Sequence, residues 1–437
     1  MRASKTATRP VTTAVMELQE RIDSLRRMVE AVSRRARGRA PDGSGVIPRA
    51  DAAAQESEVP TLGGEMFYPL DYVHGALPVG SALSVPPDIV QVIAGDLRGS
   101  TRPGSTVFLD IETTGLAGGT GTLVFLVGLG RFEGEGLRLT QLFLDDPADE
   151  RGMLEALSSF LAHASVIVTF NGKAFDLPLL ETRYALNRMN SPVVGALHAD
   201  LLGPSRRLWS SAIGSCSLAS VERHVLAVRR LNDVPGWLIP TLYADYLRTR
   251  DAAKIAPVVA HNRLDVLSLT VLFARIAACF QTDTRFGPRC ASEALGAAIH
   301  YDALGFEEAA MALYQQATRS ATSGDVRSKA VWGVLRLSKR SRLWDQCGKW
   351  AQELVVSARL DPRAWVELAK YHEHRTGDLA TALLAARRAL EVASSAPDLT
   401  HQTRVRLTRE IMHRIARLER RSAPRRADGR VSSPPAY

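Results

Sequence analysis

The amino-acid sequence predicts an α/β domain with a mixed sheet, followed by an all-α domain, and two changes of pattern along the 437 residues indicate this organisation. From Thr106 onward, short runs of apolar residues alternate with turn residues and with longer amphipathic segments, as in a sheet covered by helices. After Thr282 the strand patterns end, and alanine-rich helical patterns follow. At roughly 100–200 residues per domain, the length is consistent with two or three folded units.

The first three strands of the α/β domain are predicted to form an antiparallel meander. Their sequences are TVFLDIE at 106–112, TLVFLVGLGRF at 122–132 and LRLTQLFL at 137–144, and glycine-containing turns separate them. A helix over 149–163 and a buried strand over 165–171 follow. Helical patterns are then expected at 176–189, 217–226 and 258–280. These β/α units complete the mixed sheet.

The two ends of the chain hold the positive charge. The formal net charge is +9, and residues 1–50 contain eleven Lys/Arg and five Asp/Glu, whereas residues 420–437 contain five Arg and one Asp. We therefore expect a basic segment over 1–65, with an amphipathic helix at Val15–Val32 and a linker at 36–64, and a basic disordered tail over 421–437. Such arms bind phosphate backbones in some proteins and only aid solubility in others.

The helical domain, predicted over 284–420, contains a weak internal repeat. Similar segments begin near Gly305, Leu343 and Gly377, and these steps are close to the roughly 34 residues of a tetratricopeptide helix pair. Solenoids of this type usually bind proteins along a concave face, so a protein partner is expected here. An alanine-rich helical bundle without repeats is the alternative.

Several classes of protein are excluded by the composition. The four cysteines form no C-x-x-C pair, which argues against a disulfide scaffold and a zinc knuckle. No apolar run approaches the ~18–20 residues of a membrane span, and the first residues lack the apolar core of a secretory signal. The segment Gly115–Gly121 lacks the lysine of a phosphate-binding P-loop. We predict a cytoplasmic protein without a membrane partner.

Carboxylates at the ends of predicted strands and on one helix are the candidates for chemistry. Asp110 and Glu112 stand at i and i+2 on the first strand, so both side chains leave the same face. Asp176 follows another strand, in Asn171-Gly-Lys-Ala-Phe-Asp176, and Asp265 follows His261 by one helical turn. Acids beside apolar strands need neutralisation, and carboxylate oxygens suit Mg²⁺ or Mn²⁺. Each motif alone has little specificity.

The order FLDIETTGL, NGKAFDLPLL and HNRLD resembles the motifs of the DEDD family of 3′–5′ exonucleases, which have a ribonuclease-H-like fold. The segments GGTGTLVFLVG, HADLL, RRLW, SCSLASVE and VPGWLIPTLYADYL give a closer resemblance to the YprB-type ribonuclease-H-like proteins. This resemblance covers roughly residues 66–280, and a tetratricopeptide-like C-terminus also occurs in such proteins. It implies a ribonuclease-H-like exonuclease domain over 66–283.

The resemblance also implies roles for individual residues. Asp110, Glu112, Asp176 and Asp265 would hold two Mg²⁺ or Mn²⁺ ions, and His261 would orient or deprotonate the attacking water. The four-residue spacing between His261 and Asp265 is the one at which the family usually has tyrosine. The role of His261 is therefore open, and a packing or capping residue is the alternative.

The remaining candidates surround these five residues in the motifs. Thr113 and Leu116 match positions that touch the terminal nucleotide in related exonucleases, and His198 and Asp200 would either support the metal ligands as a pair or make an additional metal contact. Asn171 would act through hydrogen bonds and Phe175 by packing or by stacking on a base. Arg206, Arg207 and Trp209 combine charge with an aromatic ring and suit phosphate and base contacts. A core position for Phe175 and a solvated helix with a half-buried Trp209 are the alternatives.

These observations predict a metal-dependent nuclease that acts on single-stranded DNA or RNA, most simply as a 3′–5′ exonuclease with two metal ions. The alternative is a non-catalytic nucleic-acid-binding or scaffolding protein that keeps the ribonuclease-H-like fold. The sequence does not choose between DNA and RNA.

Overall fold

The computed structural model describes residues 62–99, 105–115, 119–231, 233–281, 287–396 and 399–422. The amphipathic helix predicted at Val15–Val32, most of the linker that follows it and the tail beyond Ser422 lie outside the described residues.

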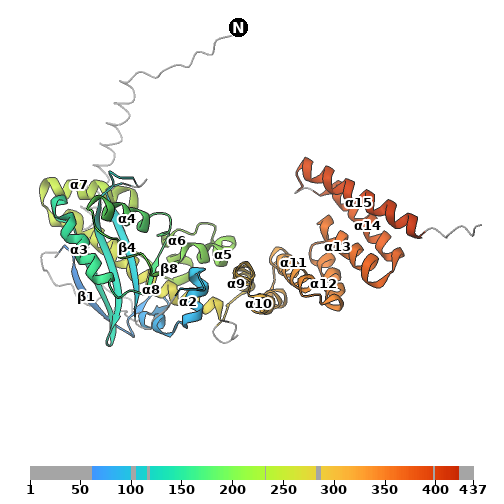
Figure 1. Ribbon diagram of the computed structural model, residues 1–437, viewed down its shortest axis with the longest axis horizontal. Helices are drawn as coiled ribbons and strands as arrows, with labels where there is room; N and C mark the ends of the chain where they lie inside the picture. The colour runs from blue at the N-terminus through green and yellow to red at the C-terminus, as the bar shows by residue number, and fades with distance from the viewer. Residues whose placement is uncertain are drawn as a thin grey trace, which may run out of the picture. The chain divides into compact units, whose positions relative to one another are not determined.

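A mixed six-stranded sheet forms the α/β part, with the strand order β1-β6-β5-β4-β7-β8. Figure 1 labels β1, β4 and β8 of this sheet. The strands of this sheet are β1 (Gly64–Pro69), β4 (Thr106–Thr113), β5 (Val124–Glu133), β6 (Gly136–Phe143), β7 (Val166–Thr169) and β8 (Leu197–Asp200). A separate two-stranded hairpin consists of β2 (Val73–His74) and β3 (Leu77–Pro78).

The predicted meander corresponds to β4, β5 and β6, which pair antiparallel with their sequence neighbours. They are not the first strands of the sheet, however, because β1 precedes them and pairs antiparallel with β6. The strand prediction missed β1 because its six residues, GEMFYP, have no buried side chain and end in proline. On the other side of β4, β7 and β8 run parallel to it, as β/α units require.

Helices connect and cover the strands. The helices of this part are α2 (Pro87–Ala94), α3 (Glu150–Leu161), α4 (Asp176–Leu186), α5 (Leu202–Ile213), α6 (Leu218–Val221) with a π turn (Glu222–Leu226), α7 (Ile239–Thr249) and α8 (Ala252–Phe280); short 3₁₀ turns lie at Val79–Ser84, Pro147–Asp149 and Gly236–Leu238. The long helix α8 packs against β4, β5 and β6. Its second half, from Val266 to Phe280, is almost entirely buried, which explains why the sequence there is apolar on all sides.

The C-terminal part is all-α. Its helices are α9 (Ala291–Leu304), α10 (Glu307–Ser320), α11 (Gly324–Arg340), α12 (Trp344–Ser357), α13 (Pro362–Tyr371) with a π turn (His372–Thr376), α14 (Leu379–Ser395) and α15 (His401–Ser422). Successive helices contact each other. Alternate helices α10, α12 and α14 begin two residues or less beyond the predicted repeat starts. A relationship with tetratricopeptide repeats stays a prediction.

One hydrophobic core continues from the sheet into the first helices of the C-terminal part. It contains Phe108 of β4, Phe273 of α8, Leu295 of α9 and Val334 of α11. None of the helices in the described part of the chain is long and apolar enough to cross a membrane.

Candidate functional site

One face of strand β4 lies against helix α8 and changes from apolar to acidic along its length. The side chains at i, i+2 and i+4 on this face are those of Phe108, Asp110 and Glu112. The Phe108 ring meets Phe273 of α8 edge to face at a centroid distance of 5.9 Å, and Asp110 accepts a hydrogen bond from α8. The packed end of the strand therefore fixes the position of its two carboxylates relative to the helix.

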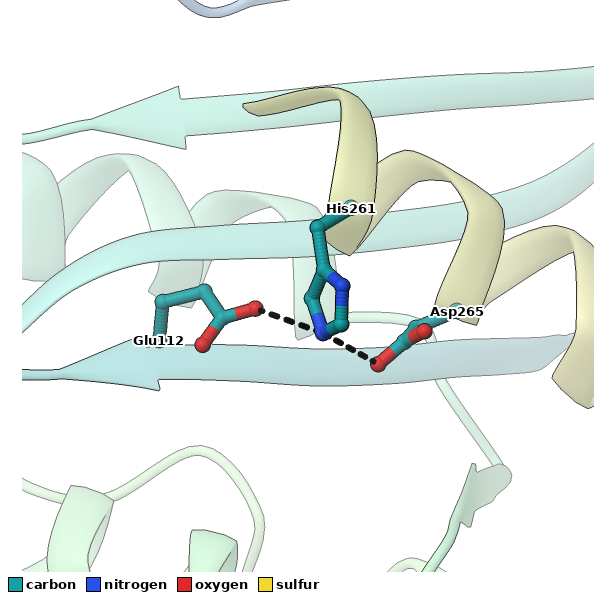
Figure 2. A group of neighbouring side chains, drawn as sticks. All are labelled: Glu112, His261 and Asp265. Atoms are coloured by element: carbon teal, nitrogen blue, oxygen red, sulfur yellow. Dashed lines mark ion pairs between the residues drawn. The ribbon is translucent and has the colours of Figure 1, made fainter. Parts of the chain in front are cut away.

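Helix α8 contributes His261 and Asp265, which stand one turn apart on the side that faces β4 (Figure 2). The Nε2 atom of His261 lies 3.8 Å from Oε1 of Glu112 and 3.6 Å from Oδ2 of Asp265. One ligand atom from each of these three residues lies within 4.8 Å of the others, so the group could hold a metal ion. All three side chains are partly accessible, with 11 to 15% of their surface exposed.

The fourth acid, Asp176, is the first residue of α4 and is 6% exposed. A carboxylate in the first turn is stabilised by the helix dipole and by free amide groups. Burial nevertheless raises the pKa of Asp176 to about 7, and the nearby charges of Asp200 and Asp265 act in the same direction.

The acids repel one another. Burial raises the pKa of Asp110 well above its usual value, and the neighbouring carboxylates of Asp265, Glu112 and Asp176 raise it further. A divalent cation among these groups would reduce the repulsion, and carboxylate oxygens are ligands that suit hard divalent cations. The residues present therefore fit a divalent metal ion, and the identity and number of the ions stay predictions.

The loop that leads into Asp176 is held by Asp200 of β8. Its carboxylate accepts hydrogen bonds from the backbone N–H groups of Asn171 at 2.8 Å, Lys173 at 3.0 Å and Leu202 at 3.0 Å. Asn171 adopts a left-handed backbone conformation with φ 70°, which asparagine tolerates better than most residues. Phe175 is half-buried directly before Asp176. Asp200 therefore positions the loop through its backbone.

Two other predicted site residues make local hydrogen bonds. His198 is hydrogen-bonded through Nε2 to the Thr169 hydroxyl at 2.8 Å, and burial lowers its pKa to about 4, so the ring is neutral at pH 7. The Thr113 hydroxyl donates to the carbonyl of Gly115 at 2.7 Å and shapes the turn after β4. Leu116 lies outside the described residues.

The RRLW segment forms part of helix α5. Arg206 and Arg207 are exposed, and no described contact links them to the four acids. Trp209 is 4% exposed, and its indole N–H donates to Oε1 of Glu293 in α9 at 2.9 Å. The predicted contact of Trp209 with a base is therefore wrong, because the indole ring is buried where α5 packs against α9.

Two residues beside the acids escaped the sequence interpretation. Asn262 of α8 is fully buried and donates to Oδ2 of Asp110 at 2.9 Å. Gln141 of β6 donates in turn to Oδ1 of Asn262 at 2.8 Å. The available signals were weak, since Asn262 is merely a neighbour of His261 and Gln141 is one polar residue within an apolar strand.

Comparison with known proteins gives the class to which this sheet and acid cluster belong. Residues 107–277 match the family model described as the RNase_H superfamily. The chain is 33% identical over 320 residues to the uncharacterized protein YprB of Bacillus subtilis (strain 168), and the alignment covers 72% of this chain and 74% of that protein. The chain therefore belongs to the YprB family.

A solved structure is also similar, at 18% sequence identity and a TM-score of 0.34. It is that of the family B DNA polymerase from the hyperthermophilic archaeon Pyrobaculum calidifontis. The match covers 56% of this chain and 30% of the polymerase chain.

Proposed function

We propose that this protein is a metal-dependent nuclease that hydrolyses phosphodiester bonds of single-stranded DNA or RNA from the 3′ end. The observation that supports this most is the group of four acids, in which burial and then the charges of the three other carboxylates raise the pKa of Asp110. The repulsion among these carboxylates destabilises the site when no cation is bound, so the four acids together suit the binding of cations. Membership in the RNase_H superfamily agrees with a nuclease.

In this proposal Asp110, Glu112, Asp176 and Asp265 hold two Mg²⁺ or Mn²⁺ ions. When bound, two such ions would stabilise the negative charge that develops in an in-line displacement at phosphorus. His261, which lies between Glu112 and Asp265, accepts a proton from the attacking water at Nε2. The new bond joins the water oxygen to phosphorus, the bond to the 3′ oxygen of the preceding nucleotide breaks, and that oxygen takes a proton from solvent to leave as a 3′-hydroxyl.

The substrate approaches past the loops around the acids. Thr113 directly follows Glu112, and Asn171 and Phe175 precede Asp176, so these residues border the same group. Phe175 is half-buried, and its accessible part can stack on a base. The exposed Arg206 and Arg207 can contact phosphates farther along the strand. The tetratricopeptide-like helices would bind a protein partner.

The test uses the purified full chain with 5′-labelled single-stranded DNA and RNA, in Mn²⁺, Mg²⁺ or EDTA. We expect a metal-dependent ladder that shortens from the 3′ end with wild type and at least a hundredfold slower cleavage with Asp110→Asn. Glu65→Gln, a change at an exposed acid of β1, is the matched control and should keep wild-type activity. Binding without cleavage in any metal would favour the scaffolding alternative.

A further inference from the structure

Three strands place a row of residues beneath helix α8. Asp110 of β4 pairs with Gly128 of β5, and Gly128 pairs with Gln141 of β6. The middle position of this row has no side chain. A Cβ atom at Gly128 would overlap the amide of Asn262 and a methyl group of Val266. The glycine thus leaves the space in which the Asn262 amide lies, between Gln141 and Asp110.

The hydrogen bonds across this space run in one direction. Gln141 donates through Nε2 to the Val259 carbonyl at 2.8 Å and to Oδ1 of Asn262 at 2.8 Å. Asn262 donates through Nδ2 to Oδ2 of Asp110 at 2.9 Å and to the Asp110 carbonyl at 3.2 Å. Gln141 is 3% exposed and Asn262 fully buried, so bulk water cannot replace these partners.

The backbone carbonyl decides the orientation of both amides. A carbonyl oxygen only accepts hydrogen bonds, so Val259 requires the NH₂ group of Gln141 to face it. That same NH₂ group then faces Asn262 and requires its oxygen on that side. The NH₂ group of Asn262 is consequently left to face Asp110, where it donates to a carboxylate instead of repelling it.

We propose that Gln141 and Asn262 form a positioning relay that holds the Asp110 carboxyl group in the orientation needed for metal binding. The relay occupies Oδ2 of Asp110, which leaves Oδ1 for a cation. Asn262 acts on the metal through Asp110, and Gln141 acts only through Asn262. This inference rests on the proposed function, because it assumes that Asp110 is a metal ligand.

The experiment is a double-mutant cycle on Mn²⁺ affinity, measured with the full chain from the electron paramagnetic resonance signal of free Mn²⁺. Asn262→Leu removes the donor at nearly constant volume, and Gln141→Met removes only the residue that orients it. A hydrogen bond to a charged group predicts about tenfold weaker Mn²⁺ binding for Asn262→Leu and a smaller loss for Gln141→Met. The double variant should bind Mn²⁺ as weakly as Asn262→Leu alone.

Thr140→Val is the matched control. Thr140 precedes Gln141 on β6 and is buried, and its hydroxyl has no hydrogen-bond partner among the described residues. This variant should keep the wild-type Mn²⁺ affinity. Urea unfolding of every variant in EDTA reports stability separately, so a general loss of stability is distinguished from a loss of metal affinity.

The outcomes separate the relay from the proposed function. Unchanged Mn²⁺ affinity in both single variants would overturn the relay, even if both unfold more easily. Additive losses in the double variant would also overturn it, because Gln141 would then act by another route. A wild-type chain that binds no Mn²⁺ would contradict the metal centre and the relay together. If the variants bind Mn²⁺ more weakly than the wild type but the wild type never cleaves nucleic acid, the result would support the relay and contradict only the nuclease.

Discussion

A carboxyl group that is buried among other carboxyl groups keeps its proton to a higher pH in the folded protein than in the unfolded chain. Asp176 is such a group, with its pKa raised to about 7 by burial. The folded state then binds more protons than the unfolded state between about pH 4 and pH 7. The metal-free protein therefore loses stability as the pH rises through this window, and metal ions restore it.

We predict that Asp176→Asn makes the metal-free protein more stable at pH 8. The amide is neutral at every pH, so it avoids a penalty on the order of 4 kcal/mol that full ionisation of a carboxyl with this pKa would bring. The same variant should gain little or no stability from Mn²⁺. Urea unfolding at pH 5 and pH 8, with EDTA and with Mn²⁺, checks both statements. Asp149→Asn, at an exposed acid before α3, is the control.

Strand β5 approaches helix α8 closely because it has glycines, Gly128 and Gly130, at the positions that face the helix. We predict that Gly128→Ala destabilises the protein by about 1–3 kcal/mol, as overpacking a tight core does. It should also weaken Mn²⁺ binding, since the new methyl group displaces the Asn262 amide. Gly152→Ala in α3, where a Cβ atom meets nothing within 4 Å, should instead leave metal affinity unchanged and raise stability slightly. Denaturant unfolding and Mn²⁺ titration measure the two effects.

Helix α15 is attached by charge as well as by apolar contacts. The Glu373 carboxylate has no exposed surface and pairs with Arg414, Arg417 at 2.8 Å and Arg421 at 3.0 Å. Burial alone would raise its pKa, but the hydrogen bond from Arg417 and the arginine charges lower it instead. The ionised Glu373 therefore stabilises the folded protein fully above its unfolded pKa of about 4.3. This stabilisation is lost as the pH falls through the lower pKa that Glu373 has in the folded protein.

We predict that Glu373→Gln loosens α15, because three guanidinium groups then lose their shared partner. The expected effect is faster amide hydrogen exchange in α15 at pH 7 and about 1–3 kcal/mol less stability for this part. Glu419→Gln, which removes an exposed pair with Arg387, should change stability by less than about 0.5 kcal/mol. Equal exchange in the two variants would show that apolar contacts alone hold α15.

The same elements show how far sequence patterns reach. Strands β4 to β6 and helices α3, α4 and α8 were predictable because each carries a local signal, either an amphipathic pattern or a run of apolar residues. Strand β1 was not, since it depends on pairing with β6 from a distant segment. The acids could be predicted as candidates because their motifs are local and occur in a characteristic order. Gln141 and Asn262 were missed because their contact joins residues that are 121 positions apart. Trp209 was misassigned because its partner, Glu293, lies in a later helix.

At the scale of the whole molecule, helix α9 completes the α/β part. Glu293 of α9 accepts from Trp209 of α5 and forms a buried ion pair with Arg275 of α8. The Tyr301 hydroxyl donates to the Phe280 carbonyl at the end of α8 at 2.7 Å. Gly296 lets α9 approach the backbone of α5, since a Cβ atom there would overlap the Arg207 carbonyl. Helices α9 to α11 also share the core that begins at the sheet.

This arrangement predicts the behaviour of two truncated chains. A chain that ends at residue 283, the boundary predicted from sequence, would expose the apolar surface that α9 covers and leave Arg275 buried without its partner, which is strongly destabilising. A chain that ends at residue 342, after α11, keeps α9 over the apolar surface and keeps Glu293 as the partner of Arg275. We expect the shorter chain to aggregate or to melt well below the longer one, which should retain stabilisation by Mn²⁺. Solubility, size-exclusion chromatography and thermal unfolding with and without Mn²⁺ test this. Equal stability of the two chains would mean that the α/β domain folds alone and that α9 belongs only to the helical repeats.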